Sequence, residues 1–229
     1  MNDYYDYRIT VEPSAPGPTS RFSFSKQEIK ELAISAGVLS LAFTIARLGI
    51  KNVIANPYAI VFPLLVAGLT ITTAFVLHEL SHKLLAQKYG AWSEYRMSIQ
   101  GLVFALLTSM LGIVFAAPGA VMIHGYLTNA QNGKISVAGP LMNLFLALVL
   151  FIATVGLAIG GFGVIAGYVY FACFINVFLA AFNMLPFGPL DGKKVWKWNK
   201  AVYIVVAVVA FGSLLFLSLI HISEPTRPY

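Results

Sequence analysis

The residues best suited to chemistry in this chain are His78, Glu79 and His82, which stand in the string His78-Glu-Leu-Ser-His82. They end an apolar stretch of about twenty residues that begins at Pro57, where a titratable cluster is costly and calls for a functional reason. On a helix, residues four apart share one face, so both imidazoles can bind one metal ion while the glutamate reaches a metal-bound water. The pattern predicts a zinc site for hydrolysis, placed in or against a bilayer.

The composition indicates a membrane protein. Hydrophobic residues make up 59% of the 229 residues, charged residues make up 10%, and the mean hydropathy is +0.80. A soluble domain carries about a quarter charged residues. The net charge of +6 comes from basic residues in short loops, which is typical of topology signals rather than of nucleic-acid binding. We therefore expect a multi-pass protein of the cell membrane, surrounded by lipid and without a nucleic-acid partner.

The apolar stretches predict the architecture. A stretch at 101–117 is near the lower length limit for crossing, and the basic residues that follow the His78 and Asp191 segments should both be cytoplasmic. This stretch is therefore better interpreted as re-entrant, with a true sixth span as the alternative. We expect an all-α polytopic membrane protein of about five to six transmembrane helices, with a re-entrant or short β segment between the HExxH helix and the next span. The five long stretches are 32–50, 57–86, 137–159, 162–185 and 201–216.

Both ends of the chain are expected to lie outside the functional domain. Residues 1–30 are rich in proline, glycine and hydroxyl side chains, which predicts a polar, disordered tail without a signal-peptide core. Residues 217–229 include a string that resembles the translation of a sequencing-library adapter, so we interpret them as non-native and expect the natural C-terminus to be missing. The predicted metalloprotease domain is 31–216.

A catalytic zinc site needs a third protein ligand and an open position for water. The single cysteine, Cys173, lies in an apolar run, so the third donor should be nitrogen or oxygen. The candidates are Asp191, Glu94 and His124. We favour Asp191, because two prolines break the helix before it and unwound backbone at membrane depth is tolerated where it lines a site. Glu94 lies in a polar loop, and His124 in an expected short strand.

Three motifs in order resemble the site-2 protease family of intramembrane zinc metalloproteases. They are the HExxH string, the string Gly139-Pro140-Leu-Met-Asn143, and the pattern N-x-x-P-x-x-x-x-D-G formed by Asn183, Pro186, Asp191 and Gly192. The resemblance covers roughly residues 57–192. It implies cleavage of a membrane-spanning protein substrate, with one zinc ion bound by His78, His82 and Asp191 and with Glu79 as the base. Family members often carry an added recognition domain, for which this chain has no room.

The expected reaction assigns roles to a few further residues. A zinc-bound water has its pKa lowered toward about 7, and Glu79 would take its proton and deliver it to the leaving amine. The developing oxyanion needs a hydrogen-bond donor, for which we favour Asn143 and Asn183 over Asn176 because both stand within motifs. Gly139-Pro140 is expected to allow a close approach of backbone. The site should face the cytoplasmic side, from which water enters.

Each role has a structural alternative. The histidines could be surface residues of an interfacial helix, although two of only four histidines flank this glutamate. The glutamate could merely orient a histidine, and Asp191 could pair with Lys193 or Lys194. Asn143 and Asn183 could bridge helices by hydrogen bonds. For the whole chain, the alternatives are a membrane metal transporter, which would need polar groups spread through several spans, and a catalytically silent zinc-binding relative.

Overall fold

The structure is a computed structural model that describes residues 22–223, with side chains up to residue 219. Within this part, five helical segments are long and apolar enough to cross a membrane, which confirms the predicted all-α polytopic fold. The five segments are Lys26–Leu48, Pro57–Lys88, Asn129–Ile159, Gly163–Asn183 and Lys200–Leu219.

The secondary-structure elements follow one another in a simple order, with helices throughout and two short strands between the second and third spans. The elements are α1 (Lys26–Leu48), α2 (Ile50–Ala55), η1 (Pro57–Ile60), α3 (Val61–Ile71), η2 (Thr72–Val76), α4 (Leu77–Lys88), β1 (Trp92–Met97), α5 (Ile99–Ser109), β2 (Gly119–His124), α6 (Asn129–Ile159), α7 (Gly163–Asn183), α8 (Asp191–Trp198) and α9 (Lys200–Ser223).

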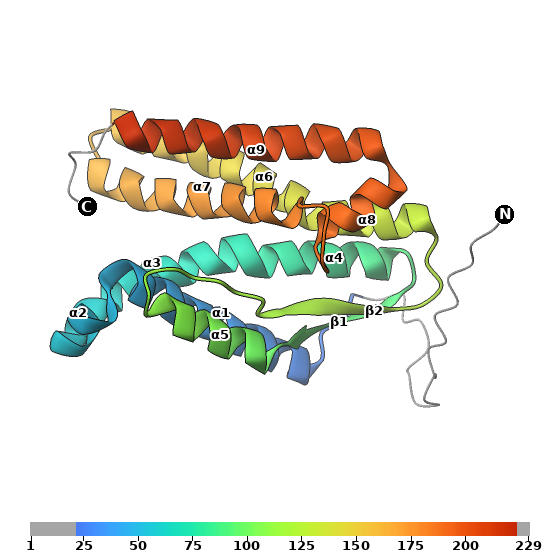
Figure 1. The fold of residues 1–229 in the computed structure, drawn as a ribbon, viewed down its shortest axis with the longest axis horizontal. Helices are drawn as coiled ribbons and strands as arrows, with labels where there is room; N and C mark the ends of the chain where they lie inside the picture. The colour runs from blue at the N-terminus through green and yellow to red at the C-terminus, as the bar shows by residue number, and fades with distance from the viewer. Residues whose placement is uncertain (1–21, 224–229) are drawn as a thin grey trace.

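The helices form layers around the segment that carries the HExxH string. Figure 1 shows α6, α7 and α9 along one side, α1 and α5 along the other, and α3 and α4 between them. Helix α4 packs on α6, and α1 packs on α3 and α5. The end of α4, the start of α6, the end of α7, helix α8 and the two strands all lie at the right-hand end of this view. Segments far apart in the sequence therefore meet at one end of the bundle.

The second span is not a uniform α-helix. It opens with a 3₁₀ turn, continues as α3, and passes through the π-helical turn η2 before it reaches α4. In this turn the Leu77 N–H bonds to the Thr72 carbonyl, five residues back. Single π turns inside α-helices are frequent at functional sites, and this one stands directly before the first histidine.

The two strands form a small antiparallel sheet in which Tyr95 lies opposite Val121. Acidic residues of α1 satisfy the outer edge of β1, because the Tyr95 N–H donates to Glu28 Oε1 at 3.0 Å and the Met97 N–H donates to Glu31 Oε2 at 2.9 Å. Burial raises the pKa of the Tyr95 phenol, whose hydroxyl contacts Ser35 and the Pro118 carbonyl. The sheet is thus tied to α1 on one side.

The first and last helices extend beyond residues 31 and 216. Helix α1 begins at Lys26, with Ser25 as its N-cap, so residues 26–30 are helical rather than part of a tail. Helix α9 runs through residue 217, where Leu217 is only 3% exposed, and ends at Ser223. Residues 1–21 and 224–229 of the two expected tails lie outside the described residues.

The stretch at 101–117 does not form a sixth crossing. Helix α5 has 11 residues, about 16 Å, and is too short to span the hydrocarbon core. After Ser109 the chain turns at Gly112, where φ is +83°, and returns as an irregular segment to β2. The segment therefore leaves and re-enters the same end of the bundle, as the sequence predicts.

Candidate metal centre

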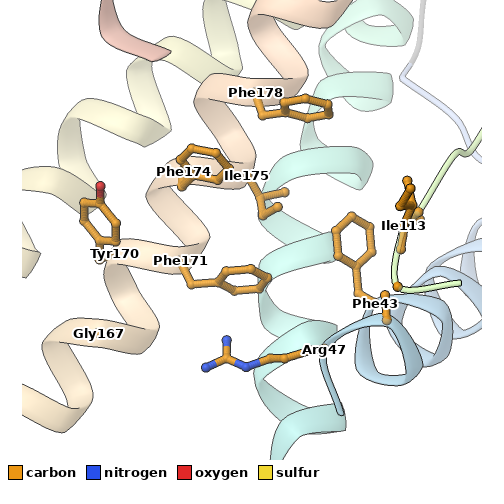
Figure 2. Close-up of a pocket in the computed structure, with 12 residues that line it drawn as sticks. Phe43, Arg47, Ile113, Gly167, Tyr170, Phe171, Phe174, Ile175 and Phe178 are labelled. Atoms are coloured by element: carbon orange, nitrogen blue, oxygen red, sulfur yellow. The ribbon is translucent and has the colours of Figure 1, made fainter. Parts of the chain in front are cut away.

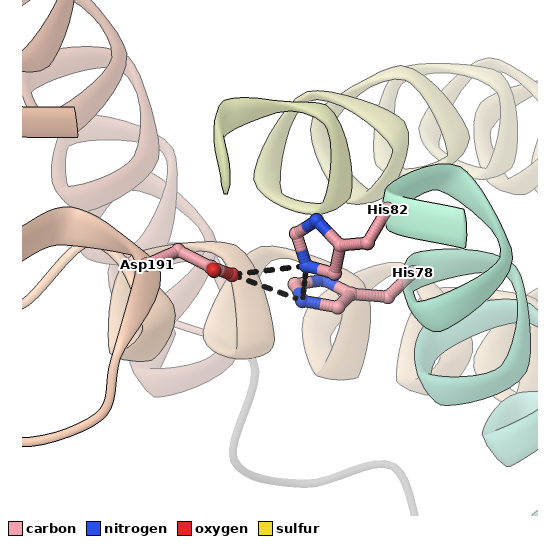
Figure 3. A group of neighbouring side chains, drawn as sticks. All are labelled: His78, His82 and Asp191. Atoms are coloured by element: carbon pink, nitrogen blue, oxygen red, sulfur yellow. Dashed lines mark hydrogen bonds and ion pairs between the residues drawn. The ribbon is translucent and has the colours of Figure 1, made fainter. Parts of the chain in front are cut away.

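Three side chains from two distant segments meet at the end of the bundle (Figure 3). His78 and His82 lie one turn apart on α4, and Asp191 is the first residue of α8. The two imidazole Nε2 atoms are 3.0 Å apart, and Asp191 Oδ2 lies 3.3 Å from that of His78 and 3.1 Å from that of His82. With zinc bonds of about 2.0–2.1 Å, the edge of a coordination tetrahedron is about 3.3 Å. The three donors therefore fit one tetrahedral zinc ion with the fourth position open.

The cluster is removed from solvent. His78, His82 and Asp191 are 3%, 7% and 8% exposed, and among the described residues no other group of three histidine, cysteine or acidic side chains converges in this way. A buried carboxylate of this kind needs a cation beside it.

The protonation of His78 follows from its neighbour on α6. Its Nδ1 lies 2.8 Å from Asn143 Oδ1, and the Asn143 amide nitrogen donates to the Ala74 carbonyl at 3.0 Å. A carbonyl can only accept, so this second bond orients the amide and directs Oδ1 at the imidazole. His78 therefore carries its proton on Nδ1, which leaves the Nε2 lone pair free for a metal.

The same reasoning applies to His82. Its Nδ1 lies 2.7 Å from the Ile135 carbonyl on α6, which accepts and so places the proton on Nδ1. Both Nε2 lone pairs then point into the same space. Two lone pairs 3.0 Å apart repel each other unless a proton or a metal ion lies between them. The donor set and its hydrogen bonds are those of a metal site.

Glycine at position 139 explains how α6 can pass directly over the imidazoles. A Cβ atom at Gly139 would lie 2.5 Å from His82 Nε2 and 2.6 Å from His78 Nε2, which is closer than such contacts occur. The next residue, Pro140, is buried inside α6 without ending the helix. The predicted close approach at Gly139-Pro140 is therefore present, and it is made to the two histidines.

The segment before α8 brings Asp191 to this point. Pro186 and Gly188, with φ of +61° at the glycine, lie in the turn between α7 and α8. Gly192 follows directly, and a Cβ there would lie 2.3 Å from the Met184 carbonyl oxygen. In the described part of the chain, the Asp191 carboxylate contacts the two histidines and forms no ion pair with Lys193 or Lys194.

Glu79 lies beside the cluster but outside the three converging donors. Its Oε2 accepts a hydrogen bond from the Val121 N–H of β2 at 3.0 Å. This bond uses the edge of β2 that faces away from β1, because Tyr95 and Val121 direct their N–H groups outward from the pair. The strand thereby holds the glutamate in one orientation.

The other sequence candidates lie elsewhere. Glu94 forms an ion pair with Arg96, and His124 stacks against Trp92 across the sheet with ring centroids 4.9 Å apart. Neither belongs to the cluster. Asn183 is half-buried at the end of α7 and donates to the Leu179 carbonyl of its own helix at 3.0 Å.

Sequence reasoning missed a buried ion pair that joins α4 to α1. Lys83 and Glu28 are 1% and 0% exposed, with Lys83 Nζ at 2.7 and 2.9 Å from the two carboxylate oxygens. Glu28 was assigned to the disordered tail. The pattern Ser25-x-x-Glu28 is a helix-start signature that could have located it, because the Ser25 side chain accepts from the Glu28 N–H.

The fold and the candidate site together define a multi-pass membrane protein with a His-His-Asp group that could hold a metal ion. No family model and no solved structure matches the chain significantly. The chain is 40% identical over 200 residues to MJ0611 of Methanocaldococcus jannaschii, across 86% of this chain and 98% of that protein. It is 27% identical over 186 residues to Rip2 of Mycobacterium tuberculosis, across 73% of this chain and 70% of that protein. Both relatives are named provisionally as zinc metalloproteases.

A third relative, the zinc metalloprotease MJ0392 of Methanocaldococcus jannaschii, is 25% identical over 178 residues, across 76% of this chain and 44% of that protein. The extent of the match to MJ0611 assigns the chain plainly: it belongs to the zinc metalloprotease family of MJ0611.

Proposed function

We propose that this protein is an intramembrane zinc metalloprotease of the site-2 protease type, which hydrolyses a peptide bond in or near the transmembrane segment of a membrane protein. The observation that carries the proposal is the meeting of His78, His82 and Asp191, with donor atoms 3.0–3.3 Å apart at one end of a helical membrane bundle. Relatives with the name of zinc metalloprotease support the same class of reaction.

The three side chains would hold the metal. Asn143 and the Ile135 carbonyl would orient the two histidines. When bound there, zinc supplies Lewis acidity toward water and toward a peptide carbonyl. Glu79 is the general base: Val121 holds its Oε2, which leaves Oε1 to take a proton from the attacking water and return it to the leaving amine. The buried surroundings strengthen each of these electrostatic interactions.

The two motif asparagines take different parts in this mechanism. Both polar atoms of Asn143 are committed, one to His78 and one to the Ala74 carbonyl, so Asn143 orients a ligand rather than binding substrate. Asn183 makes one bond within its own helix and is half-buried beside the segment that leads to Asp191. Its amide is the better candidate for donating to the developing oxyanion.

The charge distribution supports a cytoplasmic active site. The metal end of the bundle carries the start of α1, the end of α4, and helix α8, all of which bear lysines, whereas the opposite end bears Arg47 and Lys51. Lysine and arginine accumulate on the cytoplasmic side of membrane proteins. A substrate helix has its backbone bonds satisfied internally, so it must unwind before its carbonyl reaches the site.

Separate substitutions of Glu79 and Asp191 test the proposal. In purified protein, Glu79→Gln should retain zinc but lower cleavage of a membrane-spanning reporter by about 10²- to 10⁴-fold, because the general base is lost. Asp191→Asn should lose bound zinc along with cleavage, because an amide replaces a charged ligand. Glu94→Gln, a carboxylate outside the cluster, is the matched control and should change neither property.

Two outcomes would contradict the proposal. If Asp191→Asn leaves the zinc content unchanged, Asp191 is not the third zinc ligand. Zinc flux across a vesicle membrane that survives Glu79→Gln, in a protein that cleaves no reporter, would indicate a transporter instead.

A further inference from the structure

A cavity that contains none of the metal-centre residues lies between α1, α7 and the segment after α5 (Figure 2). Its volume is about 650 Å³, and its walls are almost entirely apolar. Cavities of this size accommodate small ligands rather than a whole transmembrane helix. The main apolar wall residues are Phe43, Ile113, Phe171, Phe174, Ile175 and Phe178.

Among the described residues that line this wall, Arg47 in the last turn of α1 is the one charged group. Its guanidinium reaches across to α7, where it lies 5.1 Å from the ring centroid of Phe171 and 5.7 Å from that of Tyr168. Such cation–π contacts fix the position of the charge but do not neutralise it. The cavity thus has an apolar body and a positive group held at one end.

The part of the chain that the structure describes provides no counter-ion for Arg47. From residue 32 to 216 the acidic residues are Glu79, Glu94 and Asp191, and all three are engaged at the metal end of the bundle. No ion pair involves Arg47 within the described residues. Residues 22–223 therefore leave this guanidinium free to bind an external anion.

The depth of Arg47 indicates which anion this is. Arg47 lies 21 residues after the start of α1 at Lys26, and at 1.5 Å per residue this is about 30 Å, the thickness of the hydrocarbon core. Directly beyond it α1 ends at Gly49, where φ is +78°. Arg47 therefore lies at the headgroup level of the leaflet opposite the metal centre.

We propose that this cavity is a binding site for one phospholipid of that leaflet. The phosphate would accept two hydrogen bonds from the planar guanidinium of Arg47, and an acyl chain would fill the apolar body of the cavity. A phosphate is present at this depth in every phospholipid, whereas a protein helix would need an acidic residue at this one level. The site is independent of the proposed hydrolysis, because it contains none of the residues of the metal centre.

Native mass spectrometry of the full-length protein, released from detergent with added phosphatidylglycerol, tests this site. The unmodified protein should retain one lipid under activation that strips loosely bound lipids. Arg47→Gln should lower the retained fraction about fivefold. Lys51→Gln is the matched control, because Lys51 is an exposed cation at the same end of the bundle that does not line the cavity.

A second variant tests the apolar half. Gly167 lines the cavity on α7, so Gly167→Leu should fill it and lower lipid retention while leaving Arg47 in place. Zinc content confirms that each variant is folded. The proposal is overturned if the unmodified protein retains no lipid, if Arg47→Gln and Lys51→Gln behave alike, or if Arg47→Gln leaves lipid retention unchanged but lowers cleavage of a reporter helix. The last result would assign the cavity to substrate.

Discussion

Helix α4 carries two buried charged clusters one residue apart, and they are satisfied in opposite ways. Around Lys83, the ammonium donates to both oxygens of Glu28 and to the Ser93 carbonyl at 3.0 Å, so each of its three protons has an acceptor. Around His82, two imidazole lone pairs and a carboxylate face one another and no donor stands between them. A closed set of donors and acceptors is structural, whereas a surplus of acceptors calls for a cation.

The structural cluster also supports the candidate active site. Glu28 accepts the Tyr95 N–H and so fixes β1, β1 pairs with β2, and β2 holds Glu79 through Val121. The path of contacts starts at Lys83 on α4 and returns to Glu79 on the same helix. The first span thus orients the proposed base without touching it.

Of the changes that distinguish the two clusters, Lys83→Met is expected to have the largest effect, a loss of folding stability. The change leaves the Glu28 carboxylate buried without its cation, which should cost about 3–5 kcal/mol in the free energy of unfolding. Denaturant or thermal unfolding in detergent measures this loss.

The double variant Glu28→Gln with Lys83→Met is the control, because the new amide oxygen can still accept the Tyr95 N–H. It should recover most of the lost stability. If the double variant is as unstable as Lys83→Met alone, the unpaired charge of Glu28 is not the cause of the instability.

A smaller effect is expected at the metal centre itself from Asn143→Leu. This variant removes the acceptor that orients His78 and the donor to the Ala74 carbonyl in the π turn. Loss of a hydrogen bond that orients a metal ligand lowers metal affinity by roughly 10- to 100-fold. Competition with a zinc chelator measures the affinity.

Asn183→Leu serves as the comparison, since Asn183 is proposed to act on the substrate. It should lower the catalytic rate and leave the zinc affinity unchanged. If the Asn143 variant and the unmodified protein bind zinc equally well, Asn143 does not orient His78 for metal binding.

The smallest effect is expected from Arg96→Gln, which breaks the ion pair with Glu94. The Glu94 side chain is 9% exposed, but that of Arg96 is 35% exposed, so water screens this pair and can solvate the carboxylate after the change. The loss should therefore be about 1 kcal/mol of unfolding free energy, below that of Lys83→Met. The same unfolding measurement applies. A loss as large as that of Lys83→Met would mean that burial does not decide which pairs matter in this protein.

The local parts of the fold were open to prediction because local chemistry decides them. Apolar length identifies the five spans, and the HExxH spacing places two imidazoles on one helical face. Glu28 was missed, because its serine cap was interpreted as part of a polar tail. Asn143 was expected to bind substrate or bridge helices, and only its two partners show which of its atoms are already used.

The sequence by itself determined that this chain has several apolar segments long enough to span a membrane and that two histidines share one helical face, because hydrophobic length and helical periodicity act over neighbouring residues. Only the tertiary structure decided that Asp191 reaches those histidines from the other side of the bundle and that Gly139 lets α6 pass over them. Close packing between helices sets such distances, and the residue pattern of one helix does not predict where a distant helix packs against it.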